Sequence, residues 1–132
     1  MATVPAVASS ASASSPQSSF GANSLLVSWA DMPYDAGTPV PADAFAAGNF
    51  SGRFWQVSGT FGAGGSVSLK GSNDGVNFFT LKDVAGNAAT LTSASGVILN
   101  DTPLWVKPEI TGGDGTTELT STLLMRRAAA NA

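Results

Sequence analysis

The sequence predicts an all-β protein folded as one antiparallel β-sandwich. Three observations favour this class: short segments in which apolar and polar residues alternate, turns rich in Gly, Asn and Asp between them, and no convincing long helical pattern. We expect a jelly-roll-like sandwich, with an immunoglobulin-like sandwich as the alternative.

The composition fits a single domain with a real core. Of the 132 residues, 43% are hydrophobic and 11% are charged, which is too apolar for a wholly disordered chain. The six basic and nine acidic residues give no excess of positive charge, so we expect no nucleic-acid partner. No apolar run approaches the ~20 residues that span a bilayer. We therefore expect a soluble protein with no membrane partner.

The chain begins with a segment unlike the rest. Residues 1–24 are rich in Ala and Ser and carry no charged side chain. This composition buries too little apolar surface to offset the entropy of ordering, so we expect an extended arm that is ordered only by packing on another chain. A free tail is the alternative. The segment has no positive n-region and no uninterrupted apolar h-region, so we do not expect a signal peptide.

We expect the sandwich to occupy residues 25–127, followed by a C-terminal tail at 128–132. Its first strand is 25–30, with Trp29 as the core anchor. A long Pro- and Gly-rich loop follows at 31–52, where 42–47 could form a short helical turn. Loops of this length are usually functional or bound to a partner; the alternative is a surface excursion pinned by Phe45 and Phe50.

The clearest strand pattern is at 66–81, SVSLKGSNDGVNFFTL, which predicts a β-hairpin with its turn at SNDG. A period of two places Val67 and Leu69 on the buried face, with Ser68 and Lys70 facing solvent.

The strand before the hairpin is predicted at 53–61. Its buried face would contain Trp55 and Val57. We expect this strand to lie beside the first hairpin strand and to share one buried face with Val67 and Leu69.

Three further strands are predicted, at 97–99, 104–111 and 118–125. Pro108 cannot donate a ladder hydrogen bond, so we expect it on an edge or at a bulge. The inward face of the last strand is predicted to contain Leu119, Ser121, Leu123 and Met125.

The carboxylates do not form a recognisable catalytic pattern. Asp74 and Asp114 each precede a glycine, where Asp ordinarily organises a turn. Asp31, Asp35 and Asp43 are close in sequence and could supply oxygen ligands to Ca²⁺, but their spacing is not that of an EF-hand. The chain has no His or Cys and no nucleophile or phosphate-loop motif. We expect no enzymatic activity, no cofactor and no metal site.

Two segments carry a family resemblance: WQVSGTFGAGGSVSLKGSNDGVNFFTLKD and PLWVKPEITGGDGTTELTSTLLMRR. Over roughly 53–127 the chain resembles the small β-rich structural proteins encoded beside head genes in tailed bacteriophages, including capsid decoration or cement proteins. The strand, SNDG turn and aromatic strand are also similar to discoidin-like carbohydrate- or lipid-binding sandwiches.

The phage resemblance implies a non-enzymatic protein of the virion. It would bind the outer capsid surface and cement neighbouring major capsid protein subunits. We also expect a homo-oligomer, a dimer or trimer, because edge strands such as the one with Pro108 and the long Pro-rich loop are natural contact surfaces. The alternatives are a carbohydrate-binding or adhesion module and a phage tail or head-completion protein.

Candidate partner-contact residues lie in the arm, in the long loop and at the end of the last strand, where extended segments reach neighbours. They are Val4, Pro5, Val7, Pro16, Phe20, Pro33, Tyr34, Pro39, Pro41, Phe45, Arg126 and Arg127.

Overall fold

The computed structural model describes residues 6–10, 24–34, 42–47, 50 and 52–126. Within these ranges all regular structure is β-strand. The strands are β1 (Val7–Ser10), β2 (Ser24–Pro33), β3 (Phe45–Ala46), β4 (Gly52–Thr60), β5 (Ser66–Ser72), β6 (Phe79–Thr80), β7 (Thr90–Leu91), β8 (Ser95–Ile98), β9 (Trp105–Gly112) and β10 (Glu118–Arg126).

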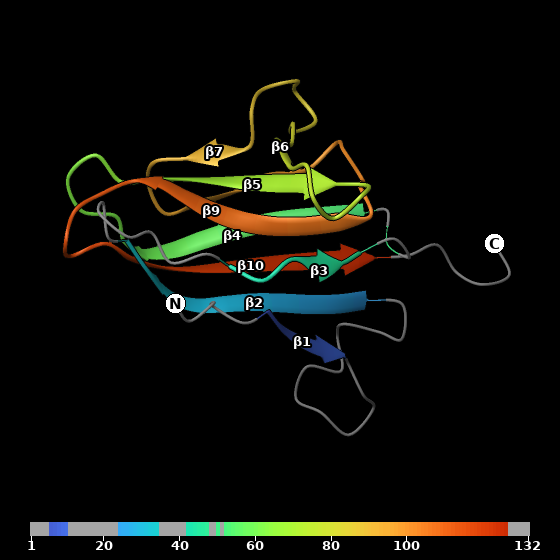
Figure 1. Cartoon of the computed structure of the whole chain (residues 1–132), viewed down its shortest axis with the longest axis horizontal. Coiled ribbons are helices and arrows are strands. Elements are labelled where there is room, and N and C mark those ends of the chain that lie inside the picture. Colours follow the sequence, from blue (N-terminus) through green and yellow to red (C-terminus); the bar gives the residue numbers. More distant parts are fainter. Residues whose placement is uncertain (1–5, 11–23, 35–41, 48–49, 51, 127–132) are drawn as a thin grey trace, which may run out of the picture.

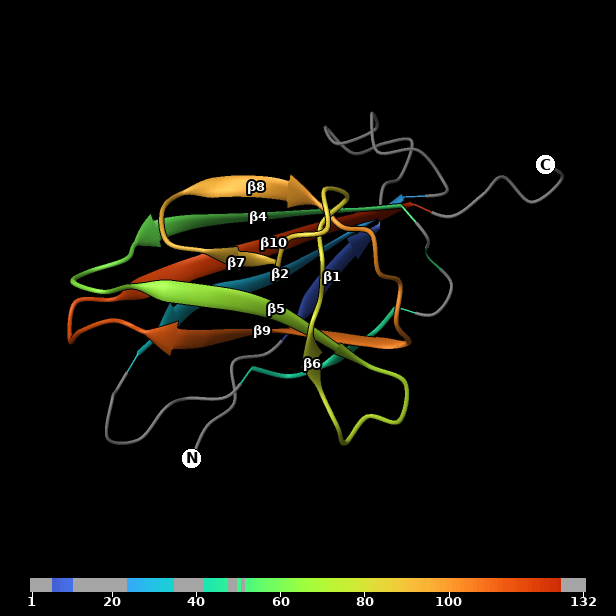
Figure 2. The same ribbon diagram turned by 90° about the horizontal axis from the view of Figure 1, so that it is seen from above.

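The strands form two antiparallel sheets packed face to face. One sheet has the order β1-β2-β10-β4-β8, and the other has the order β3-β9-β5-β6, with β7 also pairing with β5. Figure 2 shows β4, β8 and β10 in one layer and β5 and β9 in the other. Strands far apart in the sequence are neighbours, since β2 pairs with β10 and β3 with β9 (Figure 1). The predicted all-β sandwich is confirmed at this level.

The core lies between the sheets and is built from the inward positions of the long strands. Trp29 is fully buried, as predicted, and its indole N–H donates to the Asp43 carbonyl at 2.8 Å. The indole N–H of Trp55 donates to the Ser121 hydroxyl at 2.6 Å, with both side chains fully buried. The predicted inward face of the last strand is confirmed. Its members are Leu119, Ser121, Leu123 and Met125.

The hairpin predicted at 66–81 forms, but its return strand is shorter than predicted. β5 pairs with β6 through Lys70–Thr80 and Gly71–Phe79. The residues between the strands form a loop, because the backbone N–H groups of Val76 and Asn77 donate to the Asp74 carboxylate, each at 2.8 Å. Those donors are used inside the loop instead of in a ladder.

The prediction that the strand at 53–61 lies beside the first hairpin strand is wrong. Trp55, Val57, Val67 and Leu69 are all buried as predicted, but β4 and β5 belong to opposite sheets. These side chains therefore enter the core from opposite sides. The connection at 61–65 leads the chain from one sheet to the other.

Ser68 lies on the outward face of β5, opposite Val67 and Leu69, as predicted, but it is not open to solvent, because only 5% of the residue is exposed. Its hydroxyl lies 2.8 Å from that of Thr90 on the neighbouring β7. This hydrogen bond offsets the cost of removing the Ser68 hydroxyl from water.

The long loop predicted at 31–52 contains regular structure. β2 continues to Pro33, and Phe45–Ala46 form β3, which pairs with β9. The helical turn considered at 42–47 is therefore wrong. Phe45 and Phe50 do pack against the core, as predicted.

A buried arginine ties this part of the chain to the loop before β9. One guanidinium nitrogen of Arg53 donates to the carbonyls of Ala47, Phe50 and Pro103 at 2.8, 3.0 and 3.0 Å. Burial lowers the pKa of Arg53 from its ordinary value. The two hydrogens of this nitrogen are shared among three carbonyls that lie outside the strand ladders.

Part of the predicted arm joins a sheet of the same chain, since β1 (Val7–Ser10) pairs with residues 25–28 of β2. The rest of that arm and the tail at 128–132 lie outside the described residues, apart from Ala6 and Ser24. Pro108 pairs with Leu69 of β5. On the other side of β9, the described pairs with β3 are at Trp105 and Val106. Although β9 is internal in the strand order, no described residue pairs with Pro108 on the β3 side, so its missing N–H leaves no described ladder hydrogen bond unmade there.

Candidate docking face and loop groove

The outer face of the β1-β2-β10-β4-β8 sheet carries a continuous row of apolar side chains. Leu26 of β2 pairs with Leu124 of β10, Leu124 pairs with Phe54 of β4, and Phe54 pairs with Ile98 of β8. Because the neighbouring residues on these strands point into the core, the four side chains point outward. We call them the apolar row.

The apolar row is accessible to a partner. Phe54 is 40% exposed and Ile98 is 54% exposed. A shallow depression of about 260 Å³ is lined by Phe54, Ile98, Leu124, Arg126 and the largely buried Arg53. Gly96 makes room for the phenyl ring, since a Cβ at this position would lie 2.5 Å from the Phe54 Cζ. The ring therefore lies close to Gly96 of β8.

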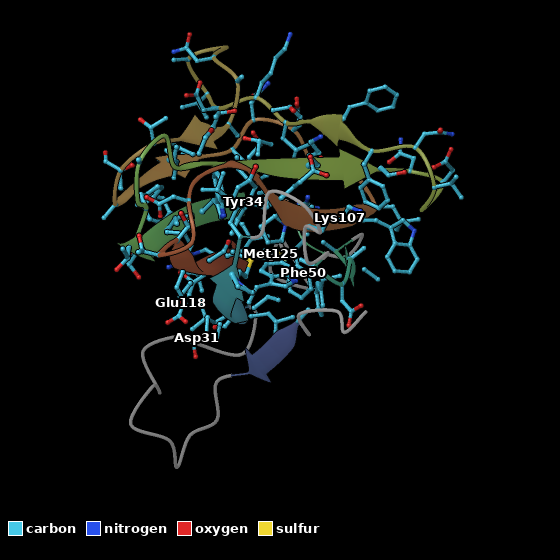
Figure 3. The ribbon with its side chains drawn as sticks, turned by 60° about the vertical axis from the view of Figure 1, so that its left-hand side comes forward. Asp31, Tyr34, Phe50, Lys107, Glu118 and Met125 are labelled. Carbon is cyan, nitrogen blue, oxygen red and sulfur yellow. The ribbon has the colours of Figure 1, made fainter. Side chains whose placement is uncertain are left out.

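The rest of this outer face is polar but nearly free of charge. The next row across the sheet contains Ser28, Thr122, Gln56 and Gly96. Among the described outward positions of β2, β4, β8 and β10, the charged residues are Arg126 near one end and Asp31 and Glu118 near the other. Figure 3 shows Asp31 and Glu118 near each other. We call this surface, with its apolar row, the docking face.

The outer face of the opposite sheet is different, because it carries charges in its middle. The Lys70 ammonium lies 2.7 Å from the Glu109 carboxylate. The Lys107 ammonium lies over the Phe78 ring, 4.4 Å from its centroid. Charge is therefore distributed unequally between the two faces of the sandwich.

A second feature is an open groove of about 620 Å³ among the loops that flank β6. We call it the loop groove. It is lined by Gly71, Ser72, Asn73, Asp74, Asn77, Phe79, Leu81, Asn100, Asp101, Thr102 and Pro103.

Asp74 fixes one wall of the loop groove. Its carboxylate accepts the Ser72 hydroxyl at 2.7 Å, the side-chain amide of Asn77 at 2.9 Å, and the two backbone N–H groups of the loop. The hydrogen bond from Ser72, followed by those from Asn77 and Val76, holds the pKa of Asp74 well below its ordinary value. This confirms the turn role predicted for Asp74.

Asp114 has the same role in the β9–β10 turn. Its carboxylate accepts the Thr116 hydroxyl at 2.6 Å, the Thr116 backbone N–H at 2.8 Å and the Ala63 backbone N–H at 2.8 Å. These bonds, led by that from the Thr116 hydroxyl, lower the pKa of Asp114 to about 2. Asp114 thereby joins its own turn to the β4–β5 turn.

The calcium hypothesis involves Asp35, which lies outside the described residues, with Asp31 and Asp43. Among the described residues, no group of three His, Cys, Asp or Glu is placed to hold a metal ion. Across the same residues, no helix is long and apolar enough to cross a membrane.

The predicted contact residues are only partly described. Pro33 is exposed at the end of β2, Tyr34 is half-buried beside it, and Arg126 is exposed at the end of β10. Phe45 is half-buried and packs on the core, so little of it is available to a partner. Val7 lies in β1. Val4, Pro5, Pro16, Phe20, Pro39, Pro41 and Arg127 lie outside the described residues.

Sequence reasoning missed the apolar row, although a signal for it exists. The strands carry adjacent apolar residues: Leu25-Leu26, Phe54-Trp55, Ile98-Leu99 and Leu123-Leu124. In a strand, such a pair must place one apolar side chain on each face. Four pairs therefore indicate an outward apolar surface.

Comparisons with protein-family models, with curated proteins and with solved structures found no match to this chain.

Proposed function

We propose that this chain is a non-enzymatic structural protein of a tailed-bacteriophage virion. It binds the outer surface of the capsid and cements neighbouring major capsid protein subunits. The observation that carries the proposal is the docking face, where the apolar row crosses four strands on a surface that is nearly free of charge. Removing such a row from water contributes about 25 cal/mol per Å² against the entropy cost of association, without the further cost of stripping water from ions.

The dimensions of the docking face suit this role. Strands of nine residues, such as β4 and β10, are about 30 Å long, and four strands side by side span about 20 Å. Because β8 has only four residues, the footprint is about 500 Å², which is below the ~800 Å² that each partner contributes to a stable interface. Contacts from outside the sheet would supply the remainder, and residues 1–24 are the candidates.

We also propose that the sandwich is a jelly roll. Pairs of strands are nested from the ends of the chain inward: β2 with β10, β3 with β9, β4 with β8, and β5 with β7. A long hairpin rolled into two sheets has this nesting, whereas the immunoglobulin order does not. Jelly rolls occur both in viral capsid domains and in lectin domains. The architecture is therefore compatible with the capsid role but does not by itself favour it.

Cryo-electron microscopy of the virion whose genome encodes this chain tests the location. We expect density on the outer capsid surface at symmetric positions, as a dimer or trimer, with the docking face toward the major capsid protein. A single copy, or one ring at the portal vertex, would contradict surface decoration and support a head-completion or tail role.

A reattachment assay tests the docking face itself. Particles lacking the protein are mixed with purified variants and sedimented, and bound protein is quantified. Phe54→Ser and Ile98→Ser should each reduce attachment at least tenfold, because each removes an exposed apolar side chain from the row. Phe79→Ser is the matched control: this phenylalanine is 71% exposed but lies in the loop groove, and the variant should attach normally. Equal attachment by all three variants would remove the docking face from the proposal.

A further inference from the structure

The loop groove lies outside the docking face and has a different chemistry. Three segments build it: the end of β5 with the loop after it, β6 with Leu81, and the β8–β9 connection at 100–103. Its volume of about 620 Å³ falls within the range of about 300 to 1,000 Å³ that holds small ligands.

An exposed aromatic ring stands at the groove. Phe79 is 71% exposed even though it lies in a strand. The apolar floor beside it contains Leu81 and Pro103, and Gly71 allows them to pack closely, since a Cβ at residue 71 would collide with both. The groove therefore has an apolar surface against which a ligand can stack.

Around this surface are polar groups whose hydrogen-bonding capacity is only partly used. One oxygen of Asp101 accepts the Lys82 backbone N–H at 2.9 Å, and the side-chain oxygen of Asn73 accepts the Leu104 N–H at 3.1 Å. This leaves the second Asp101 oxygen and the Asn73 amide N–H groups available. The side chains of Asn100 and Thr102 make no hydrogen bond to another described residue.

The groove is also held in shape before any ligand arrives. The hydrogen bonds to Asp74 and those of Asn73 and Asp101 fix both of its polar walls to the backbone. A site that is ordered in advance loses less entropy when it binds.

Charge selects the class of ligand. Two carboxylates, from Asp74 and Asp101, line the groove, and no Lys or Arg is among its described lining residues. Phosphates, nucleic acids and acidic sugars would be repelled. A neutral sugar fits instead: its hydroxyl groups pair with carboxylate and amide side chains, and its polarised C–H face stacks on the negative face of an aromatic ring.

We propose that the loop groove binds a neutral glycan, with Phe79 as the stacking platform and Asn73, Asn100, Asp101 and Thr102 as hydrogen-bonding partners. This inference goes beyond the capsid role and does not depend on it, since groove and docking face use different residues. It would give the outer face of a particle, or the free protein, a means of adhering to a neutral polysaccharide surface.

The test is a titration of the full chain, followed by ¹H–¹⁵N NMR, with cellotetraose, maltotetraose and chitotetraose as probes. At least one probe should shift the amides of 71–81 and 100–104 in a saturable manner, with a dissociation constant of about 0.1 to 1 mM. Phe79→Ala should weaken this binding at least tenfold, and Phe79→Trp should retain it. Val76→Ala is the matched control, because Val76 is 79% exposed on the same loop but does not line the groove.

Three results would overturn the proposal: no saturable shift with any of the three probes, equal binding by Phe79→Ala, or the same shifts on titration with calcium chloride alone. The last would assign the groove to a cation. Because Phe79 is exposed, its variants should keep the parent melting temperature, which is measured alongside. Loss of glycan binding with normal attachment to particles, or the reverse, separates this inference from the proposed capsid role.

Discussion

At the scale of single residues, two aspartates organise the loops that strand pairing leaves open. Asp114 accepts hydrogen bonds from Ala63 and Thr116 and so joins two turns at one end of the sandwich. Asp74 does the same within the loop after β5. A carboxylate that accepts several N–H and O–H groups is stabilised in its charged form, which is why both pKa values are lowered.

Asp114→Asn should lower the melting temperature near neutral pH and weaken its dependence on acid. The pKa of Asp114 is about 2 in the fold, against an ordinary value of 3.8. Its stabilising effect is therefore complete above about pH 4 and is lost as the pH falls through about 2. Thermal unfolding measured across this pH range should show that acidification lowers the melting temperature of the variant less than that of the parent protein.

Thr116→Ser keeps the hydroxyl that donates to Asp114 and serves as the control, with the acid dependence of the parent. A constant difference in melting temperature between Asp114→Asn and the parent at every pH would show that the charge of Asp114 contributes nothing.

Leu69 and its neighbour Lys70 test which face of β5 is buried. Leu69 is fully buried, so Leu69→Ala should cost about 2 to 5 kcal/mol by leaving a cavity. Lys70 pairs with Glu109 at the surface, where such pairs contribute about 1 kcal/mol or less, so Lys70→Ala should cost no more than that. Urea unfolding, followed by tryptophan fluorescence, measures the free energy of unfolding of both variants. A larger loss for Lys70→Ala would mean that the register of β5 is wrong by one residue.

At the scale of elements, β10 is the central strand of the sheet with the order β1-β2-β10-β4-β8. It pairs with β2 on one side and with β4 on the other along most of its length. Its inward face is apolar except for Ser121, which accepts the Trp55 indole N–H. This buried hydrogen bond fixes the β4–β10 register, because a shift of one residue would leave the indole N–H without an acceptor.

Ser121→Ala should destabilise the fold by about 1 to 3 kcal/mol, since it leaves a buried N–H unpaired. Ser58→Ala, at an exposed position of β4, should change stability by about 0.5 kcal/mol or less. Urea unfolding measures both, and the Trp55 indole proton should shift in the NMR spectrum of Ser121→Ala alone. Equal stability of the two variants would mean that this hydrogen bond does not specify the pairing.

At the scale of the whole molecule, the two outer faces of the sandwich differ in charge, and one long strand edge is covered by a short strand. The docking face is uncharged in its middle, whereas the opposite face carries the Lys70–Glu109 pair and Lys107. The edge of β2 is covered by β1 through four residue pairs. An exposed strand edge is a template for pairing with another chain, and β1 replaces the ten-residue edge of β2 with an edge of four residues, which is a poorer template.

Deletion of residues 1–10 should therefore cause concentration-dependent association, because it removes β1 and exposes the backbone groups of β2. Sedimentation velocity measures the effect. Deletion of residues 1–5 alone retains β1 and should behave as the parent protein does. If both deletions sediment identically, the cover provided by β1 has no role in preventing association.

The candidate surfaces could be predicted from the sequence only in part. Adjacent apolar residues such as Leu25-Leu26 and Phe54-Trp55 indicate that some strands have two apolar faces. They do not say that Leu26, Leu124, Phe54 and Ile98 fall in one row. That alignment comes from strand register across the sheet, which depends on pairing between distant segments. The loop groove likewise joins residues 71–81 to 100–103 through tertiary contacts.

The sequence by itself determined the all-β class, most strand positions, the burial of Trp29, the inward faces of β4 and β10 and the turn roles of Asp74 and Asp114. Alternation and turn chemistry act over a few neighbouring residues, so they can be recognised in the chain alone. Only the tertiary structure decided that β4 and β5 separate into opposite sheets, that Ser68 is buried beside Thr90, and that β2 pairs with β10. Those outcomes depend on burying the inner faces of both sheets against each other. The residues involved are far apart in the sequence, so the pattern of neighbouring residues does not predict them.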